Sequence, residues 1–180
     1  RNRADMVMFW GSNPAESHPR HFTKYSLMPK GMFLPNGRKD RTCVIVDVRK
    51  TKSTKAADIF IQIKPRCDFE GLWTLRALAQ NVELDPAQVL EDTEVPLETW
   101  QDLMERMKAC KFGVIFFGVG VTMTRGKHAN SEAVLALARD MNKYTRFTCK
   151  PNRGHGNVTG ADNVVSWGTG YPFGVNLARG

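Results

Sequence analysis

The strongest constraint on the fold is a set of short, continuous apolar runs that are rich in β-branched and aromatic residues. They cover residues 5–10, 42–49, 59–63 and 112–121. Runs of this length and composition are typical of buried strands. The first run is followed at once by the turn sequence GSNP, in which Asn13 and Pro14 predict the start of a helix.

Helical periodicity fills most of the intervals between these runs. Apolar residues recur at helical spacing in residues 69–80, 97–107 and 131–144, and a short apolar stretch at 146–149 predicts a last strand. Residues 81–96, with Pro86 and Pro96, are expected to form a polar connection. Strands that alternate with helices predict an α/β fold, with a Rossmann-like, mostly parallel sheet and helices on both faces.

The last 31 residues differ from the rest, because they hold seven of the fifteen glycines and show no clear periodicity. We therefore divide the chain into a Rossmann-like domain at residues 1–150 and a glycine-rich irregular tail at residues 151–180, expected to lie over a ligand or a neighbouring domain. The chain begins at Arg1 without a methionine and stops inside glycine-rich sequence, so we interpret it as an internal piece of a longer polypeptide.

Charge and cysteine content narrow the classes of partner. The net charge of +8 favours nucleic acid, acidic membrane surfaces or phosphorylated cofactors. The four cysteines are widely spaced and form no CxxC pair; they are Cys43, Cys67, Cys110 and Cys149. Their spacing gives no zinc or iron–sulfur motif, and scattered free thiols are typical of a protein in a reducing compartment. No run approaches the ~20 apolar residues of a membrane span, and no signal-peptide core is visible, so we expect a cytoplasmic protein.

Glycines and polar residues follow three of the predicted strands. They are Gly11, Ser12 and Asn13 after the first run, Asp47 and Arg49 after the second, and Gly118, Gly120 and Thr122 in the longest. The carboxyl ends of parallel strands meet at one edge of a sheet, where glycine admits a phosphate or a ring and polar side chains pair with a base or phosphate oxygens. The pattern predicts a nucleotide site, although each glycine alone is equally the residue of an ordinary turn.

Arg153 and His155 stand apart from these strand ends, in the glycine-rich stretch KPNRGHGNVTG. A guanidinium can hold a small anion such as formate, and histidine exchanges protons near neutral pH. We hypothesise that both side chains face a cofactor and act in catalysis. The alternative for Arg153 is an ion pair with a carboxylate across a domain interface.

Four motifs, in their order along the chain, resemble the molybdopterin oxidoreductase superfamily. They are FWGSNPAESHPRH, VIVDVRKTKSTKAADIFIQIKP, FFGVGVTMTRGKHAN and NRGHGNVTG. Within its formate-dehydrogenase-like branch they are most similar to the archaeal family of formylmethanofuran dehydrogenase B subunits. The resemblance covers the whole chain. It implies part of a catalytic subunit that uses tungsten or molybdenum to reduce CO2 to formate, for the formylation of methanofuran in methanogenesis.

The resemblance also implies a bis-molybdopterin guanine dinucleotide cofactor and a place for each site residue. One guanosine end would lie by Gly11, Ser12 and Asn13. The guanine or its phosphates would be surrounded by Asp47, Arg49 and Thr51. The pterin or pyrophosphate would be lined by Gly118, Gly120 and Thr122. Gly154 completes the cofactor-binding set. Arg153 matches the arginine that relatives place beside the metal, and His155 stands where they carry glutamine.

The family's metal-ligating cysteine or selenocysteine and its iron–sulfur cysteines lie upstream of these motifs, so no metal ligand is assigned and the chain alone is expected to be inactive. The implied partners are an amidohydrolase-like subunit and polyferredoxin subunits, without nucleic acid. Relatives tend to carry glycine where Arg66 stands, and Gly71 interrupts a predicted helix, which indicates a divergent member.

Three other interpretations stay open. They are a fragment of a formate dehydrogenase or another molybdopterin oxidoreductase, a basic nucleic-acid-binding module, and a structural scaffold. A nucleic-acid module needs aromatic residues interleaved with the cations on one face, whereas the aromatic residues here fall mostly inside predicted strands and helices.

Overall fold

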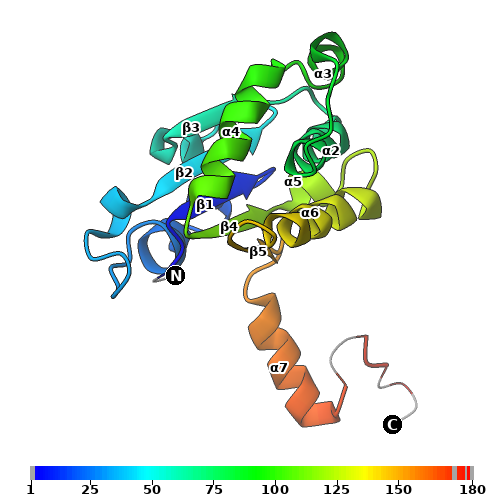
Figure 1. Cartoon of the computed structure of the whole chain (residues 1–180). Coiled ribbons are helices and arrows are strands. Elements are labelled where there is room, and N and C mark those ends of the chain that lie inside the picture. The colour runs from blue at the N-terminus through cyan, green and yellow to red at the C-terminus, as the bar shows by residue number, and fades with distance from the viewer. Residues whose placement is uncertain (1–2, 172–173, 177, 179–180) are drawn as a thin grey trace.

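The computed structural model describes residues 3–171, 174–176 and 178, and its centre is a five-stranded parallel sheet in the order β3-β2-β1-β4-β5 (Figure 1). The strands are β1 (Met6–Trp10), β2 (Thr42–Asp47), β3 (Ile59–Gln62), β4 (Phe112–Phe117) and β5 (Arg146–Pro151). The central strand, β1, pairs with β2 on one side and with β4 on the other. The predicted α/β class and parallel sheet are confirmed.

Every residue of β1 is buried, because the strand has a packed layer on each face. Met6, Met8 and Trp10 point to one face and Val7 and Phe9 to the other, as the twofold alternation of a strand requires. This two-sided burial explains why the strand reads as a continuous apolar run rather than as an alternating one.

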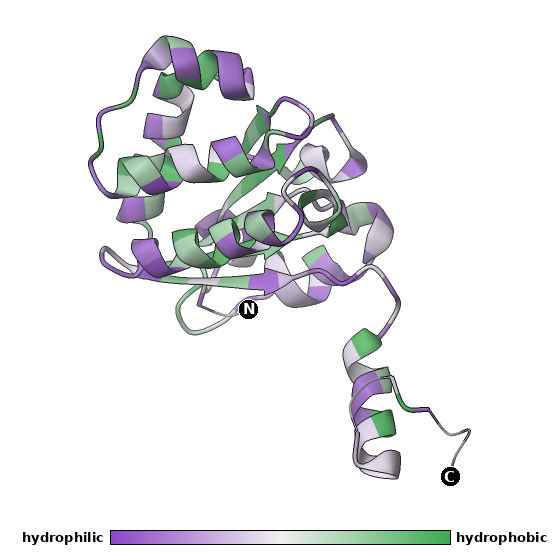
Figure 2. Ribbon diagram, turned by 90° about the vertical axis from the view of Figure 1, so that its right-hand side faces the viewer, coloured by the Kyte–Doolittle hydropathy of each residue, from purple (hydrophilic) through white to green (hydrophobic). Residues whose placement is uncertain are grey.

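Four helices cover the Trp10 face of the sheet. They are α2 (Asp68–Ala79), α3 (Pro86–Thr93), α4 (Leu97–Ala109) and α6 (His128–Met141). Hydrophilic and hydrophobic residues alternate along these helices (Figure 2), so each can turn an apolar stripe to the sheet. The Phe9 face has a thinner cover, which includes the π-helix η1 (His21–Ser26) and Leu27.

Short helical turns follow three strand ends. They are α1 (Pro14–Ser17) after β1, η3 (Lys52–Ala56) after β2 and α5 (Val119–Thr122) after β4, whereas the turn η2 (Gly37–Asp40) directly precedes β2. Helix α1 begins at Pro14 as predicted, but the Asn13 side chain does not cap it. The longest strand was expected to reach residue 121; it ends at Phe117, because the chain turns at Gly118 into α5 and buries Val121.

Helix α3 corrects the expectation of a polar connection at residues 81–96. Asp85 accepts a hydrogen bond from the Ala87 N–H through its side chain (2.9 Å), and Pro86 occupies the first turn. A proline in the first turn favours a helix start, because its missing N–H would have no partner there anyway. Pro86 therefore begins a helix that sequence reasoning treated as broken.

Helix α7 (Val158–Thr169) is a second correction, because it lies in the tail that was expected to be irregular. It starts after Asn157 and ends at Gly170, both in the left-handed region, and Val158, Ala161 and Val165 recur at helical spacing between them. None of its residues is buried, and it projects away from the sheet (Figures 1 and 2). In the described part of the chain, no helix has the length and apolar character needed to cross a bilayer.

Candidate functional site

The candidate site lies at the carboxyl edge of the sheet, between β1 and β4. From β1 the chain proceeds to β2 and β3 on one side, whereas β4 and β5 lie on the other. Loops that leave neighbouring strands in opposite directions open a crevice at such a reversal point. A cleft of about 470 Å³ opens there and is lined by the loops after β1, β4 and β5, including Gly11, Ser12, Asn13, Gly118, Gly120, Arg153 and Gly154.

A second cavity of about 300 Å³ adjoins this cleft and shares part of its wall. Thr122 and His155 line it, together with Arg153, Gly118 and Gly154. The structure therefore gathers all the residues predicted for the site around the two cavities, except Asp47, Arg49 and Thr51.

The glycines of the cleft allow the loops after β1 and β4 to touch. The Gly118 N–H donates to the Trp10 carbonyl (3.0 Å) and the Gly120 N–H to the Gly11 carbonyl (3.2 Å). A Cβ on Gly118 would overlap the Gly11 carbonyl oxygen, and one on Gly120 would lie 2.7 Å from it. Gly11 itself has a φ of +53°, which favours glycine. The close contact of the two loops therefore depends on these glycines.

Asn152 is a site residue that sequence reasoning missed. Its side-chain Nδ2 donates to Ser12 Oγ at 3.0 Å, and its backbone N–H donates to the Phe117 carbonyl at 2.7 Å. Both side chains are buried, Ser12 being 6% exposed and Asn152 9%. The one available signal was its position, a polar residue at a strand end directly before Arg153.

Arg153 is paired with a carboxylate, although not across a domain interface as one alternative from the sequence expected. Its Nη1 donates to Asp162 Oδ2 at 3.5 Å, and Asp162 lies on α7. The partner therefore comes from the chain's own tail. The Arg153 side chain is 44% exposed, so the pair stands at the mouth of the two cavities rather than in the core.

The loops after β1 and β2 are tied together by Asn13. Its Oδ1 accepts a hydrogen bond from the hydroxyl of fully buried Ser53 (2.7 Å), and its Nδ2 donates to Glu16. Ser53 Oγ in turn accepts from the Ala15 N–H (3.0 Å). This linkage replaces the capping role predicted for Asn13.

Asp47, Arg49 and Thr51 lie along the loop after β2, outside the two cavities. Burial raises the pKa of Asp47, whose Oδ1 accepts a hydrogen bond from the Arg49 N–H (3.4 Å). The Thr51 hydroxyl oxygen is buried and has no hydrogen-bond partner among the described residues. A buried polar atom without a partner costs about 1–3 kcal/mol, which a bound ligand can recover.

Asp68 is a second carboxylate at this edge that the sequence analysis overlooked. It is 3% exposed at the first position of α2, and it accepts hydrogen bonds from Trp10 Nε1 (2.9 Å) and the Thr124 hydroxyl (3.4 Å). Burial raises the pKa of Asp68, and the charge of Asp47 adds to the effect. An acidic residue in the first turn of a helix is ordinary, so nothing in the sequence distinguishes Asp68 from a residue that only favours the helix start.

The cysteines form no site of their own. Burial raises the pKa of Cys43 and Cys110 to about 12 each, so these thiols stay protonated near neutral pH. Within the described residues, no three His, Cys, Asp or Glu side chains converge as metal ligands do.

The chain is an α/β domain with a parallel sheet, and a polar, glycine-lined cleft lies at the reversal point of its strand order, where ligands bind in open sheets of this kind. No protein-family model matches the chain. Over all 180 residues, the chain is 46% identical to the B subunit of the tungsten-containing formylmethanofuran dehydrogenase 2 of Methanocaldococcus jannaschii, and equally so to that of Methanococcus maripaludis. The resemblance to this kind of subunit is thereby confirmed.

The chain spans 41% of the length of these two relatives. It is also 24% identical to a putative formate dehydrogenase of Bacillus subtilis, over 94% of this chain and 19% of that protein. A solved structure, the formyltransferase/hydrolase complex FhcABCD from Methylorubrum extorquens with methylofuran, superposes with a TM-score of 0.65 over 99% of this chain and 44% of that one. At 19% identity this superposition confirms the fold.

Proposed function

We propose that this chain is the cofactor-binding part of the catalytic subunit of a formylmethanofuran dehydrogenase. Its cleft would hold one guanosine diphosphate end of a bis-molybdopterin guanine dinucleotide that carries tungsten or molybdenum. The observation that supports the proposal most is the cleft itself, because seven of the residues matched by the resemblance line it from the loops after β1, β4 and β5. The whole-chain identity of 46% to the B subunit of a tungsten-containing enzyme supports the choice of cofactor.

The residues present fit the phosphates and bases of this cofactor. Gly11, Gly118 and Gly120 let the loops after β1 and β4 pack against each other along the wall of the cleft, because a Cβ on any of them would collide with the facing loop. The orphaned Thr51 hydroxyl and the Arg49 cation offer donors for phosphate oxygens, and the Asp47 carboxylate offers an acceptor for a ribose or a guanine. When bound, the cofactor would supply the two-electron reduction of CO2 to formate.

Arg153 and His155 are the residues that we assign to the reacting end. The planar guanidinium of Arg153 would hold the carboxylate of formate, and His155, on the shared wall of the smaller cavity, would exchange a proton with solvent or product. Asp162 contacts Nη1 of Arg153 and so restricts how the guanidinium turns.

We also propose that the protein is cytoplasmic and assembles with an amidohydrolase-like subunit and polyferredoxin subunits, since its relatives are named as one subunit of an enzyme. A formate dehydrogenase is the second candidate, and its support is the 24% identity to the Bacillus protein. No relative reported above supports the nucleic-acid module, and Phe9, Trp10 and Trp100 lie in the core, where they cannot stack on bases.

Binding of guanosine diphosphate (GDP) tests the cleft together with the end of β2, where the resemblance assigns Asp47 to the guanine or its phosphates. We expect the chain to bind GDP with at least tenfold preference over ADP by isothermal titration calorimetry. Asp47→Asn should weaken GDP binding about tenfold, the usual effect of losing one charged hydrogen bond. The matched control is Asp92→Asn, a half-buried position on α3 outside the cleft that should leave affinity unchanged. Equal affinity for GDP and ADP, or no binding at millimolar GDP, would contradict the proposal.

The role of Arg153 requires the intact enzyme. In the whole subunit, Arg153→Lys should retain the metal and pterin but lose most formate turnover, because a point charge cannot reproduce a planar two-pronged contact. Metal analysis, pterin fluorescence and turnover measure the two effects separately. Unchanged turnover would remove Arg153 from the active site.

A further inference from the structure

We propose that Asn152 is a positioning residue that sets the Ser12 hydroxyl to donate its proton to a phosphate oxygen bound in the cleft. The inference rests on the proposed function, and it adds a residue and a direction of hydrogen bonding that neither the sequence motifs nor the relatives assign. It concerns the class of ligand that presents phosphate or diphosphate oxygens.

The geometry holds Asn152 firmly from two sides. Its backbone N–H is bonded to the Phe117 carbonyl at the end of β4, and its Nδ2 reaches Ser12 at the end of β1, although 140 residues separate the two in sequence. Asn152 therefore connects the ends of three strands, because it also follows β5. Both it and Ser12 line the 470 Å³ cleft.

The direction of the Ser12–Asn152 hydrogen bond decides what Ser12 can offer a ligand. An amide nitrogen only donates, so Ser12 Oγ acts as the acceptor and the hydroxyl proton remains available. Within the described residues, this proton has no acceptor among the hydrogen bonds of the structure. On its other side Ser12 packs against Gly118, where a Cβ would lie 2.9 Å from the Ser12 Cβ. The cleft is the space that remains, so the proton is presented to whatever binds there.

Because the Ser12 hydroxyl is held as a hydrogen-bond donor, it suits a ligand whose oxygens accept hydrogen bonds. Phosphate oxygens at neutral pH accept hydrogen bonds, and a hydroxyl held as a donor needs no rearrangement to meet them. Asn152 also directly precedes Arg153, so the same residue fixes the main chain from which the proposed catalytic guanidinium extends.

The experiment measures GDP affinity and thermal unfolding for the 180-residue chain and four variants: Ser12→Ala, Asn152→Ala, the double variant and Asn152→Asp. We expect Ser12→Ala and Asn152→Ala each to weaken GDP binding about tenfold, and the double variant to bind no more weakly than Ser12→Ala. Asn152→Asp keeps the shape, but its carboxylate takes the Ser12 proton and repels phosphate. It should therefore lose at least tenfold more affinity than Asn152→Ala.

If Asn152 had a purely structural role, Asn152→Asp would lose less GDP affinity than Asn152→Ala. It would stay close to the wild type in both affinity and unfolding temperature. That result, or additive losses in the double variant, would overturn the inference while the wild type still binds GDP. If the wild-type chain fails to bind GDP, the proposed function fails first, so the two failures are distinguishable. The control is Asn163→Ala on α7, exposed and outside the cleft, which should bind like wild type.

Discussion

Arg66 occupies a backbone conformation that suits glycine. Its φ is +71°, in the turn between β3 and α2. For a residue with a side chain, the left-handed region costs about 1–2 kcal/mol, because the Cβ approaches the following carbonyl. The structure thus gives a physical reason to expect glycine at this position.

Arg66→Gly should therefore stabilise the chain. We expect the free energy of unfolding to rise by about 0.5–1 kcal/mol, since relief of strain exceeds the extra backbone entropy of glycine. Urea denaturation followed by circular dichroism measures the change. Lys50→Gly is the control, because Lys50 is not among the described positive-φ residues and gains no relief. A loss of stability in Arg66→Gly would show that its side chain contributes contacts that outweigh the strain.

His21 makes stability depend on pH. Burial lowers the pKa of His21 to about 4, and the positive charges of His18 and Lys150 add to the effect. The Nδ1 atom of His21 lies 3.1 Å from Ser26 Oγ. In the unfolded chain the pKa returns to about 6.5. The folded state therefore binds fewer protons between these values, and stability is present above pH 6.5 and declines as pH falls toward 4.

The His21 contribution can be isolated by substitution. Between pH 6.5 and 4, we expect the wild type to lose stability with a slope of up to about 1.4 kcal/mol per pH unit more than His21→Gln does. Chemical denaturation at a series of pH values gives both slopes. His128→Gln, at an exposed position of α6, should retain the wild-type slope. Parallel curves for the wild type and His21→Gln would refute the assignment.

At the scale of elements, an ion pair joins the two long helices α2 and α6. Arg76 Nε donates to Asp140 Oδ2 at 2.9 Å, and both side chains are nearly buried, at 11% and 6% exposure. Burial alone would raise the pKa of Asp140, but the hydrogen bonds from Arg76 and Arg139 hold it below its ordinary value. The pair therefore stabilises the fold above about pH 4 and is lost as pH falls further.

Asp140→Asn should destabilise the chain by about 3 kcal/mol at pH 7, because it leaves the Arg76 cation buried without a charged partner. The matched control is Asp102→Asn. It breaks the exposed pair of Asp102 with Arg106 on α4, at 59% and 53% exposure, and should cost less than about 0.5 kcal/mol. Thermal and urea unfolding compare the two, and similar small losses would mean that water reaches Asp140.

Some helices and strands could be predicted from the sequence and others could not. Strands β1, β2 and β4 were predictable, because burial on two faces forces a continuous apolar run such as Met6–Trp10. Helix α3 was not, since Pro86 marks both helix starts and helix breaks. Helix α7 was hidden because its glycines mask a weak apolar stripe. At the site, the residues after β1 and β4 were predictable from their place at strand ends, whereas Asn152 and Asp68 acquire their roles only through partners far away in sequence.

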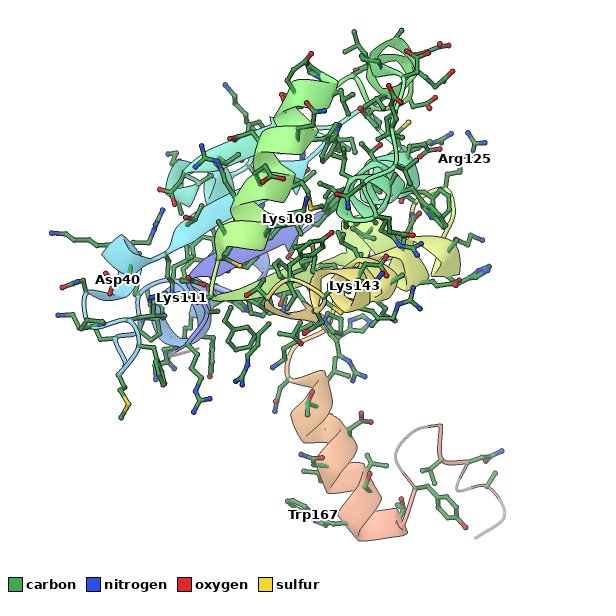
Figure 3. The ribbon with its side chains drawn as sticks, in the orientation of Figure 1. Asp40, Lys108, Lys111, Arg125, Lys143 and Trp167 are labelled. Carbon is green, nitrogen blue, oxygen red and sulfur yellow. The ribbon has the colours of Figure 1, made fainter. Side chains whose placement is uncertain are left out.

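At the scale of the whole molecule, α7 is joined to the rest of the chain by few contacts among the described residues. Trp167 stands out from the helix (Figure 3) and is 79% exposed, and none of the helix's residues is buried. A chain that ends after Gly156 should therefore unfold within about 2 °C of the full chain by calorimetry. A chain that ends after Thr145 is the control. It lacks β5 and buried Phe147, and should not fold. A large drop for the first truncation would show that the tail packs on the body in solution.

The central position of β1 has a consequence for the nascent polypeptide. Strand β1 leaves the ribosome before β4, its second neighbour, and after β2 another 64 residues, 48–111, must be translated before β4 begins. At about 5–20 residues per second, β1 stays half-paired for several seconds with an apolar edge open. Aggregation is therefore expected chiefly during synthesis, so that lower growth temperatures or a ribosome-bound chaperone should raise the yield of this chain more than any change made to the purified protein.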